Sequence, residues 1–165
     1  MRPALAVPLV LVAFAPLGCD VLAEPSGYSL EDPPPAYADL VSAVNEARAH
    51  PRTCGSETFG ATEPVAWDGR LERAAERHTL DMAEHGVLAH TGSDGSTVGD
   101  RVTHAGYQWR RVGENLALAN RPAREVVDMW LASAGHCANV MHPGYVEMGV
   151  AAREGYWTQV FGRPL

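Results

Sequence analysis

Apolar residues recur at helical spacing in the first half of the chain and predict two helices there. The first is expected from about residue 36 to Pro51. Its apolar face is made of Leu40, Val41, Val44 and Ala47. The second, about residues 69–85, follows Asp68, a favourable N-cap, and stops at Gly86. The stretch between these helices is expected to be mostly loop.

Further helical segments are predicted in the second half. A short helix is expected from Val98 to His104. A longer one has Asn120 as its cap and Pro122 in its first turn, and Gly135 ends it. Its inward-facing residues are expected to be Val126, Met129 and Trp130. Residues 136–141 add a further turn of helix.

Alternating patterns predict three strands, at about residues 111–119, 146–152 and 156–162. The last two are joined by a turn at Glu154-Gly155. Helices and strands in this order predict an α/β fold, a three-layer α/β/α sandwich around a small, mostly antiparallel central sheet.

One position breaks the alternation of the first strand. Glu114 shares a face with Val112, Leu116 and Leu118 by period two. A carboxylate on a buried face is costly unless it is paired or bound to a metal. We therefore predict a functional role for Glu114.

Two histidines and one more glutamate have similarly distinctive surroundings. His90 follows a helix in a turn-rich run, His136 follows a predicted helix stop, and Glu125 lies at the edge of a helix face. Two imidazoles and two carboxylates could be metal ligands, an acid/base set, or both. For Glu125, an ordinary first-turn glutamate favoured by the helix dipole is the alternative. His78, on an apolar helix face, is expected to be a core histidine.

The N-terminus is typical of a targeting segment. Residues 4–17 are apolar but too short to span a bilayer. In one interpretation residues 1–19 form a lipoprotein-type signal and Cys19 becomes lipidated, anchoring the protein to a membrane. In the other, cleavage follows Ala23. Residues 20–35 are expected to be a Pro-rich linker before a single domain at 36–165.

Composition narrows the classes of function. The formal net charge of −7 disfavours a nucleic-acid partner, which needs a basic face. After export, Cys54 and Cys137 are an even pair that favours a disulfide. Such a bond would close a loop of roughly 80 residues, which chain entropy values at about 4 kcal/mol. Two buried free thiols, or zinc binding by Cys137 and a neighbouring histidine, are the alternatives.

The ordered motifs resemble the CAP superfamily (cysteine-rich secretory, antigen 5 and pathogenesis-related proteins), in its secreted bacterial form. The matching stretches are Leu40 to Arg48, Trp67 to Met82, His90 to Gly95, Gly113 to Ala117, Glu125 to Trp130, Ser133 to Met141 and Tyr156 to Gly162. The resemblance implies an α/β/α fold whose cavity carries His90, Glu114, Glu125 and His136. It also implies that the histidines hold a divalent metal, often zinc.

Three functions stay open at this stage. The first is an extracytoplasmic domain that binds a divalent metal and a small, lipid-like or cell-envelope ligand. The second is a metal-dependent hydrolase with Glu114 or Glu125 as its base, although the chain has no His-Glu-x-x-His and no Gly-x-Ser-x-Gly motif. The third is a cell-surface interaction module without catalysis. The sequence does not indicate an oligomeric state.

Overall fold

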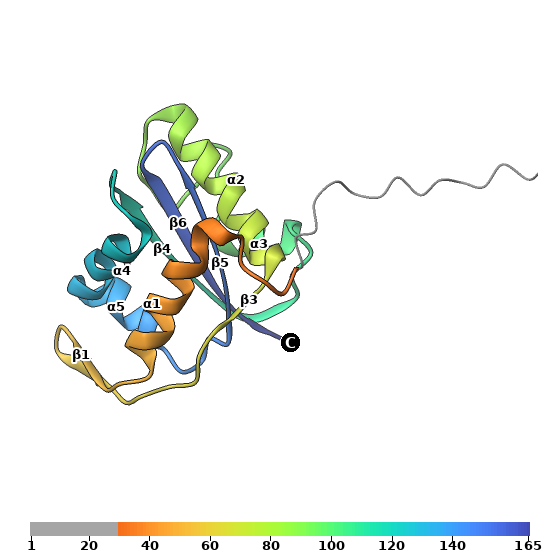
Figure 1. The fold of residues 1–165 in the computed structure, drawn as a ribbon. Helices are drawn as coiled ribbons and strands as arrows, with labels where there is room; N and C mark the ends of the chain where they lie inside the picture. Colours follow the sequence, from red (N-terminus) through yellow and green to blue (C-terminus); the bar gives the residue numbers. More distant parts are fainter. Residues whose placement is uncertain (1–29) are drawn as a thin grey trace, which may run out of the picture.

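The computed structural model describes residues 30–165, which form a four-stranded sheet with helices on both faces and a separate hairpin (Figure 1). In chain order the elements are a 3-10 turn (Pro35–Tyr37), α1 (Ala38–Arg48), β1 (Arg52–Cys54), β2 (Glu57–Phe59), β3 (Ala66–Trp67), α2 (Gly69–His85), α3 (Val98–His104), β4 (Trp109–Leu118), α4 (Ala123–Ala132), α5 (Ala134–Met141), β5 (Glu147–Arg153) and β6 (Tyr156–Pro164).

The sheet has the strand order β3-β5-β6-β4. Strand β6 pairs antiparallel with both β5 and β4, and only the short β3 runs parallel to its neighbour. Helices α2 and α3 pack on one face, while α1, α4 and α5 gather on the other (Figure 1). The predicted three-layer sandwich with a mostly antiparallel sheet is therefore confirmed.

Strand β4 is an edge of the sheet, and side chains from the α4 and α5 region cover it. Three alternate residues of β4 direct their carbonyl oxygens to this open edge: Val112, Glu114 and Leu116. They accept hydrogen bonds from the hydroxyl of Tyr145 (3.2 Å), the amide of Asn139 (3.1 Å) and the indole of Trp130 (3.0 Å), respectively. This pairing removes the open row of acceptors through which an edge strand can recruit another chain.

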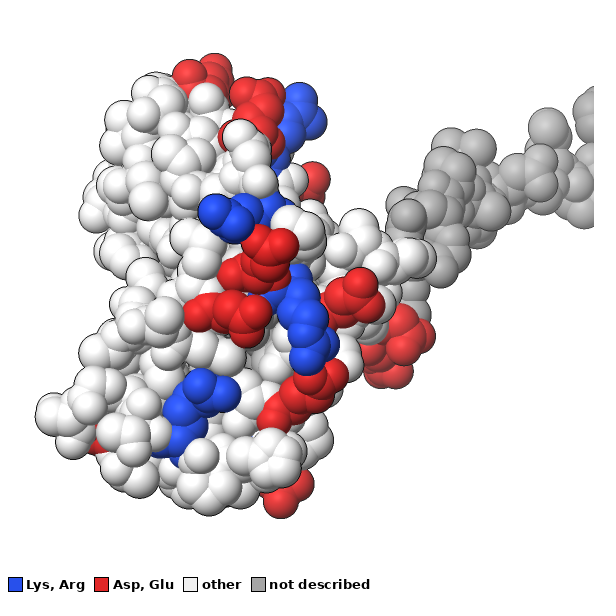
Figure 2. All heavy atoms as spheres, turned by 60° about the vertical axis from the view of Figure 1, so that its left-hand side comes forward, with Lys and Arg blue, Asp and Glu red and all other residues white. Residues whose placement is uncertain are grey.

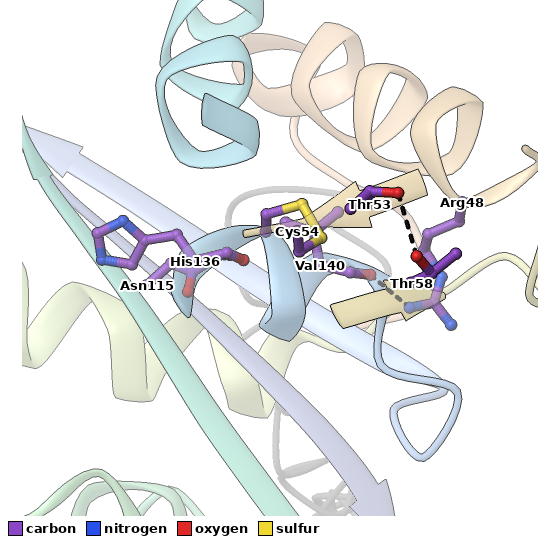
Figure 3. The surroundings of a disulfide bond; sticks show 8 residues. Arg48, Thr53, Cys54, Thr58, Asn115, His136 and Val140 are labelled. Atoms are coloured by element: carbon purple, nitrogen blue, oxygen red, sulfur yellow. Dashed lines mark hydrogen bonds between the residues drawn. A yellow bond between two sulfur atoms is a disulfide. The ribbon is translucent and has the colours of Figure 1, made fainter. Parts of the chain in front are cut away.

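Cys54 and Cys137 form a disulfide, as predicted (Figure 3). It joins β1 to α5 across 83 positions, with the two Cα atoms 5.4 Å apart. The free-thiol and cysteine–zinc alternatives are thereby excluded in this structure. The bond lies one residue beyond His136, whose imidazole points away from it (Figure 3).

The boundaries of the helices near the site differ from the sequence prediction. Helix α4 begins after Pro122, which is its N-cap, so Asn120 does not cap it. It ends at Ala132, because Ser133 adopts an extended conformation (φ −98°, ψ 124°). Gly135 is therefore not a helix stop but part of α5. Met129 is exposed rather than buried.

The first half also contains structure that the pattern did not predict. The segment expected to be loop holds the β1–β2 hairpin and the short β3. The end of the predicted linker contacts the domain, since the Gly69 amide donates to the Leu30 carbonyl (2.8 Å). The N-cap role of Asp68 and the left-handed stop at Gly86 are confirmed. The predicted signal segment, with Cys19, lies outside the described residues.

On the face drawn in Figure 2, acidic and basic side chains are interspersed, and the basic ones do not gather into one patch. The formal net charge of the chain is −7. Within residues 30–165, no helix combines the length and apolar character needed to cross a bilayer.

Candidate functional site

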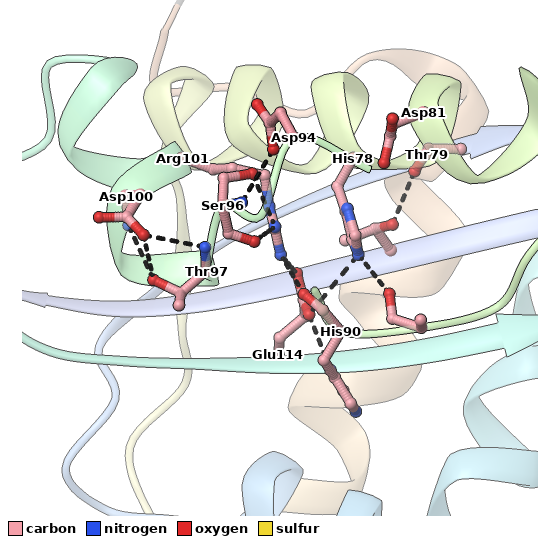
Figure 4. A network of polar contacts seen from close by, with 12 residues as sticks. His78, Thr79, Asp81, His90, Asp94, Ser96, Thr97, Asp100, Arg101 and Glu114 are labelled. Carbon is pink, nitrogen blue, oxygen red and sulfur yellow. Dashed lines mark hydrogen bonds and ion pairs between the residues drawn. The ribbon is translucent and has the colours of Figure 1, made fainter. Parts of the chain in front are cut away.

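The centre of the candidate site is the pair formed by Glu114 and His90. Glu114 lies on β4 with only 2% of its side chain exposed. Its Oε1 accepts a hydrogen bond from His90 Nδ1 at 2.8 Å. His90, in the loop between α2 and α3, keeps 63% of its side chain exposed, and its ring points away from α2 (Figure 4). The predicted need of Glu114 for a partner is confirmed.

The Glu114 carboxylate forms an ion pair with a buried arginine, Arg101. Arg101 of α3 donates from Nη2 to Glu114 Oε2 at 2.7 Å, with 1% of the arginine side chain exposed. Paired in this way, a carboxylate can stay ionised on a buried face. Both oxygens of Glu114 are thus engaged, one by His90 and the other by Arg101.

A second histidine borders the same carboxylate from α2. His78 is buried, and its Nε2 donates to the Ala89 carbonyl oxygen at 2.7 Å. The same nitrogen lies 4.0 Å from Glu114 Oε1. Burial lowers the pKa of His78 and favours its neutral form. His78 is therefore the predicted core histidine, although it also borders the site.

His136 comes from the opposite layer, in the first turn of α5. Its backbone carbonyl accepts a hydrogen bond from the Asn115 amide at 3.2 Å, and Asn115 also bonds Gln159 and Asn139. Burial lowers the pKa of His136, and the charge of His90 lowers it further. The two histidines are thus close enough to interact electrostatically, and His136 favours the neutral form that binds metals.

The structure places Glu125 apart from this cluster. Its carboxylate accepts from Arg121 at 2.9 Å on the surface of α4, where both side chains are at least half exposed. Across residues 30–165, no hydrogen bond or ion pair joins Glu125 to His90, Glu114 or His136. The observed contacts are those of an ordinary first-turn glutamate on a helix.

The two imidazoles are the side chains of this cluster whose chemistry suits a metal. Because His90 Nδ1 donates to a carboxylate, its Nε2 is the nitrogen left with a lone pair. Glu114 orients this ring and is not itself free to coordinate. In the described part of the chain, no group of three or more His, Cys, Asp or Glu is arranged to hold a metal. An ion bound by His90 and His136 would therefore complete its shell with water or an added ligand.

A groove of about 710 Å³ lies next to the site, between α2, the loop at 93–96 and α3. His78 and Arg101 line it, together with the surface ion pair of Arg77 and Asp94. The four residues predicted to share a cavity are not in its lining. The groove is thus separate from the exposed ring of His90.

The sequence did not single out Arg101, Asn115 or Asn139 as parts of the site. Arg101 sits in a short helix where an arginine usually faces solvent. Asn115 and Asn139 looked like parts of motifs without a separate role. A signal existed for Asn115, because period two places it on the face of β4 opposite to Glu114.

Comparison with known proteins agrees with this architecture. A model of the cysteine-rich secretory protein (CAP) family matches residues 41–161. The protein YkwD of Bacillus subtilis (strain 168), described as uncharacterized, is 29% identical over 101 residues. That match covers 60% of this chain and 39% of the relative, so the chain corresponds to about two fifths of that protein.

Solved structures share the fold. An extracellular protein with an SCP domain from Bacillus anthracis superposes with a TM-score of 0.60 at 27% identity, over 62% of this chain and 34% of its own. An outer surface protein of Borrelia burgdorferi superposes with a TM-score of 0.63 at 19% identity, over 79% of this chain and 93% of its own. A cysteine-rich secretory protein of Staphylococcus aureus superposes with a TM-score of 0.61 at 16% identity, over 81% of this chain and 40% of its own.

Proposed function

The chain belongs to the cysteine-rich secretory protein family, and on this premise we propose that it is an extracytoplasmic protein that binds one zinc-like divalent ion through His90 and His136. The hydrogen bond from His90 Nδ1 to the buried Glu114 carries the proposal. Metal-binding histidines commonly donate their second ring nitrogen to a carboxylate, which fixes the ring and makes the other nitrogen a better ligand.

The charges around the two histidines also support metal binding. Arg101 balances the charge of Glu114, and His136 has a lowered pKa that keeps its ring neutral near pH 7. Neutral imidazoles suit zinc and similar ions, whereas magnesium and calcium prefer oxygen ligands. The open coordination positions would accept water or a small ligand. A lipid-like or cell-envelope ligand remains a prediction from the family resemblance.

We favour binding over hydrolysis. A metal-dependent hydrolase needs a carboxylate free to take a proton from the metal-bound water. Both oxygens of Glu114 are already engaged, and Glu125 pairs with Arg121 on the surface. The two glutamates that the sequence offered as bases therefore lack the contacts for that role in this structure.

Calorimetric titration of zinc into the metal-free protein tests the site. We expect one ion per chain in the wild type and no binding when His90→Ala and His136→Ala are combined. Glu114→Gln should weaken binding by about 10- to 100-fold, because both histidines remain but His90 loses the carboxylate that fixes its ring.

The matched control combines His50→Ala with His104→Ala, two exposed histidines outside the cluster, and should leave zinc affinity unchanged. Equal affinity in the wild type and the His90/His136 double variant would refute the metal site. That result would favour a cell-surface interaction module.

Location is the second part of the proposal. The B. anthracis and B. burgdorferi neighbours are described as extracellular and outer surface proteins. We propose that Cys19 is lipidated and that the following linker tethers the domain to a membrane. Replacing Cys19 with Ser should move the protein from the membrane to the soluble fraction. A soluble wild type that begins at Glu24 would show instead that cleavage follows Ala23.

A further inference from the structure

Arg101 binds both the loop that carries His90 and the carboxylate that His90 contacts. Its guanidinium donates from Nη1 to the Ser96 carbonyl oxygen (2.8 Å) and from Nη2 to both the His90 carbonyl oxygen (3.0 Å) and Glu114 Oε2 (2.7 Å). Ser96 and His90 both lie in the loop between α2 and α3. One buried side chain therefore fastens the loop that carries His90 to the carboxylate that orients its ring (Figure 4).

The ring of His90 depends on this arrangement. With 63% of its side chain exposed, it is not held by packing, and its bond to Glu114 fixes its direction. Glu114 is well placed to do so because β4 pairs with β6 at this position. The carboxylate only accepts, so His90 must donate to it from Nδ1, and Arg101, which carries only donors, holds the carboxylate in the orientation that serves both groups.

We propose that Arg101 is a positioning residue for His90: it holds the Glu114 carboxylate and the His90 loop together, so that the carboxylate fixes the ring as the Nδ1–H tautomer with Nε2 directed outward as the ligand. The choice of tautomer depends only on contacts within the chain. Its expected effect on metal affinity, in contrast, rests on the function proposed above. An arginine suits this task because its planar group offers five N–H donors in fixed directions. A lysine ammonium cannot span the loop and the carboxylate in the same way.

Nitrogen NMR of ¹⁵N-histidine-labelled, metal-free protein tests the proposal, because the ring shifts distinguish the two neutral tautomers. Spectra recorded at about pH 8, where imidazoles are neutral, should show His90 of the wild type as the Nδ1–H form. In Glu114→Gln, Arg101 still requires an oxygen, so the amide NH₂ group should face His90. His90 Nδ1 must then accept a hydrogen bond, and the tautomer should switch to Nε2–H.

Glu114→Gln is nearly isosteric, so this test does not depend on removing the buried arginine. A His90 ring that stays in the Nδ1–H form in Glu114→Gln would overturn the proposal, since Arg101 would then not decide which atom faces the ring. Arg101→Lys adds a direct test. Combined with Glu114→Gln it should give a mixture of His90 tautomers, because the residue at 101 then no longer fixes which amide atom faces the ring; alone it should weaken zinc binding by about ten-fold or more.

Arg77→Gln is the matched control, because Arg77 binds the same loop through Asp94 (2.9 Å) without contacting Glu114. It should keep the wild-type tautomer and zinc affinity. A Glu114→Gln/Arg101→Lys protein with the same single tautomer as Glu114→Gln would contradict the positioning role. A wild type that shows the Nδ1–H tautomer but binds no zinc would refute the proposed function and leave the positioning role supported.

Discussion

At the scale of single residues, the polar side chains buried beside the site are held by specific partners rather than by solvent. Glu114 is paired with Arg101, and His78 donates to the Ala89 carbonyl oxygen. These contacts explain how ionisable groups can lie between the sheet and α2 without a large loss of stability. They also make the fold sensitive to protonation.

His78 should contribute to a loss of stability at mildly acidic pH. Burial lowers its folded-state pKa below the ordinary value near 6.5. The unfolded chain therefore takes up a proton first as the pH falls, and unfolding becomes easier. The stabilising effect is complete above about pH 6.5 and declines as the pH falls from there towards the folded-state pKa, by at most about 1.4 kcal/mol per pH unit.

Urea unfolding at about pH 7.5 and about pH 5.5 measures this effect. His78→Gln removes the ionisable ring but keeps a side-chain N–H donor that can reach the Ala89 carbonyl oxygen. The variant should lose less stability than the wild type between the two pH values. An equal loss in both proteins would show that His78 is not responsible.

At the scale of elements, the edge of β4 depends on side chains from another layer. Trp130→Phe should lower the free energy of unfolding by about 2 kcal/mol, because it leaves the buried Leu116 carbonyl without its indole donor (3.0 Å). Chemical denaturation measures the change. The matched control is Trp109→Phe on the same strand, whose indole bonds the exposed Thr103 hydroxyl. If Trp109→Phe lowers the free energy of unfolding as much as Trp130→Phe does, this account is contradicted.

The elements show which features the sequence could predict. Period-two alternation correctly predicted β4 and the burial of Glu114, but Leu118, expected on the same buried face, is exposed at the end of the strand. Asp68 and Gly86 correctly marked the ends of α2. Such signals are local, because they depend on backbone geometry and the nearest buried surface. Arg101 carries no local signal, since only the packing of α3 against β4 determines that it is buried.

Failures of prediction at other elements have the same origin. The sequence predicts a helix stop at Gly135, but the break occurs one position before α5, at the extended Ser133. The hairpin after α1 is too short to show an alternating pattern. Glu125, at the edge of a helix face, could have turned inward or outward, and tertiary packing placed it outward with Arg121.

At the scale of the whole molecule, the site joins two layers that meet across the edge of the sheet. His90 comes from the side of α2 and α3, and His136 comes from α5 on the other side. The Asn115 amide links them through β4, since it bonds the His136 carbonyl from a position next to Glu114. Any change in how α5 sits against the sheet should therefore alter the distance between the two imidazoles.

The Cys54–Cys137 disulfide is the covalent restraint on that position. It ties α5 to the β1–β2 hairpin across 83 positions, and for a loop of this size chain entropy predicts a stabilisation of about 4 kcal/mol. Reduction should lower the free energy of unfolding by about this amount and weaken zinc binding, because His136 precedes Cys137. Reduced wild type is the best comparison, since both sulfurs stay in the core and the change is confined to the cross-link.

Urea unfolding and zinc titration of the oxidised and reduced protein separate these two effects. The Cys54→Ala/Cys137→Ala double variant, measured with and without reductant, shows whether reductant acts elsewhere or binds the added zinc. Lower stability with unchanged zinc affinity would mean that the disulfide stabilises the fold without positioning His136. Unchanged stability would contradict the cross-link argument itself, because a loop of this length restricts the unfolded chain wherever the bond lies.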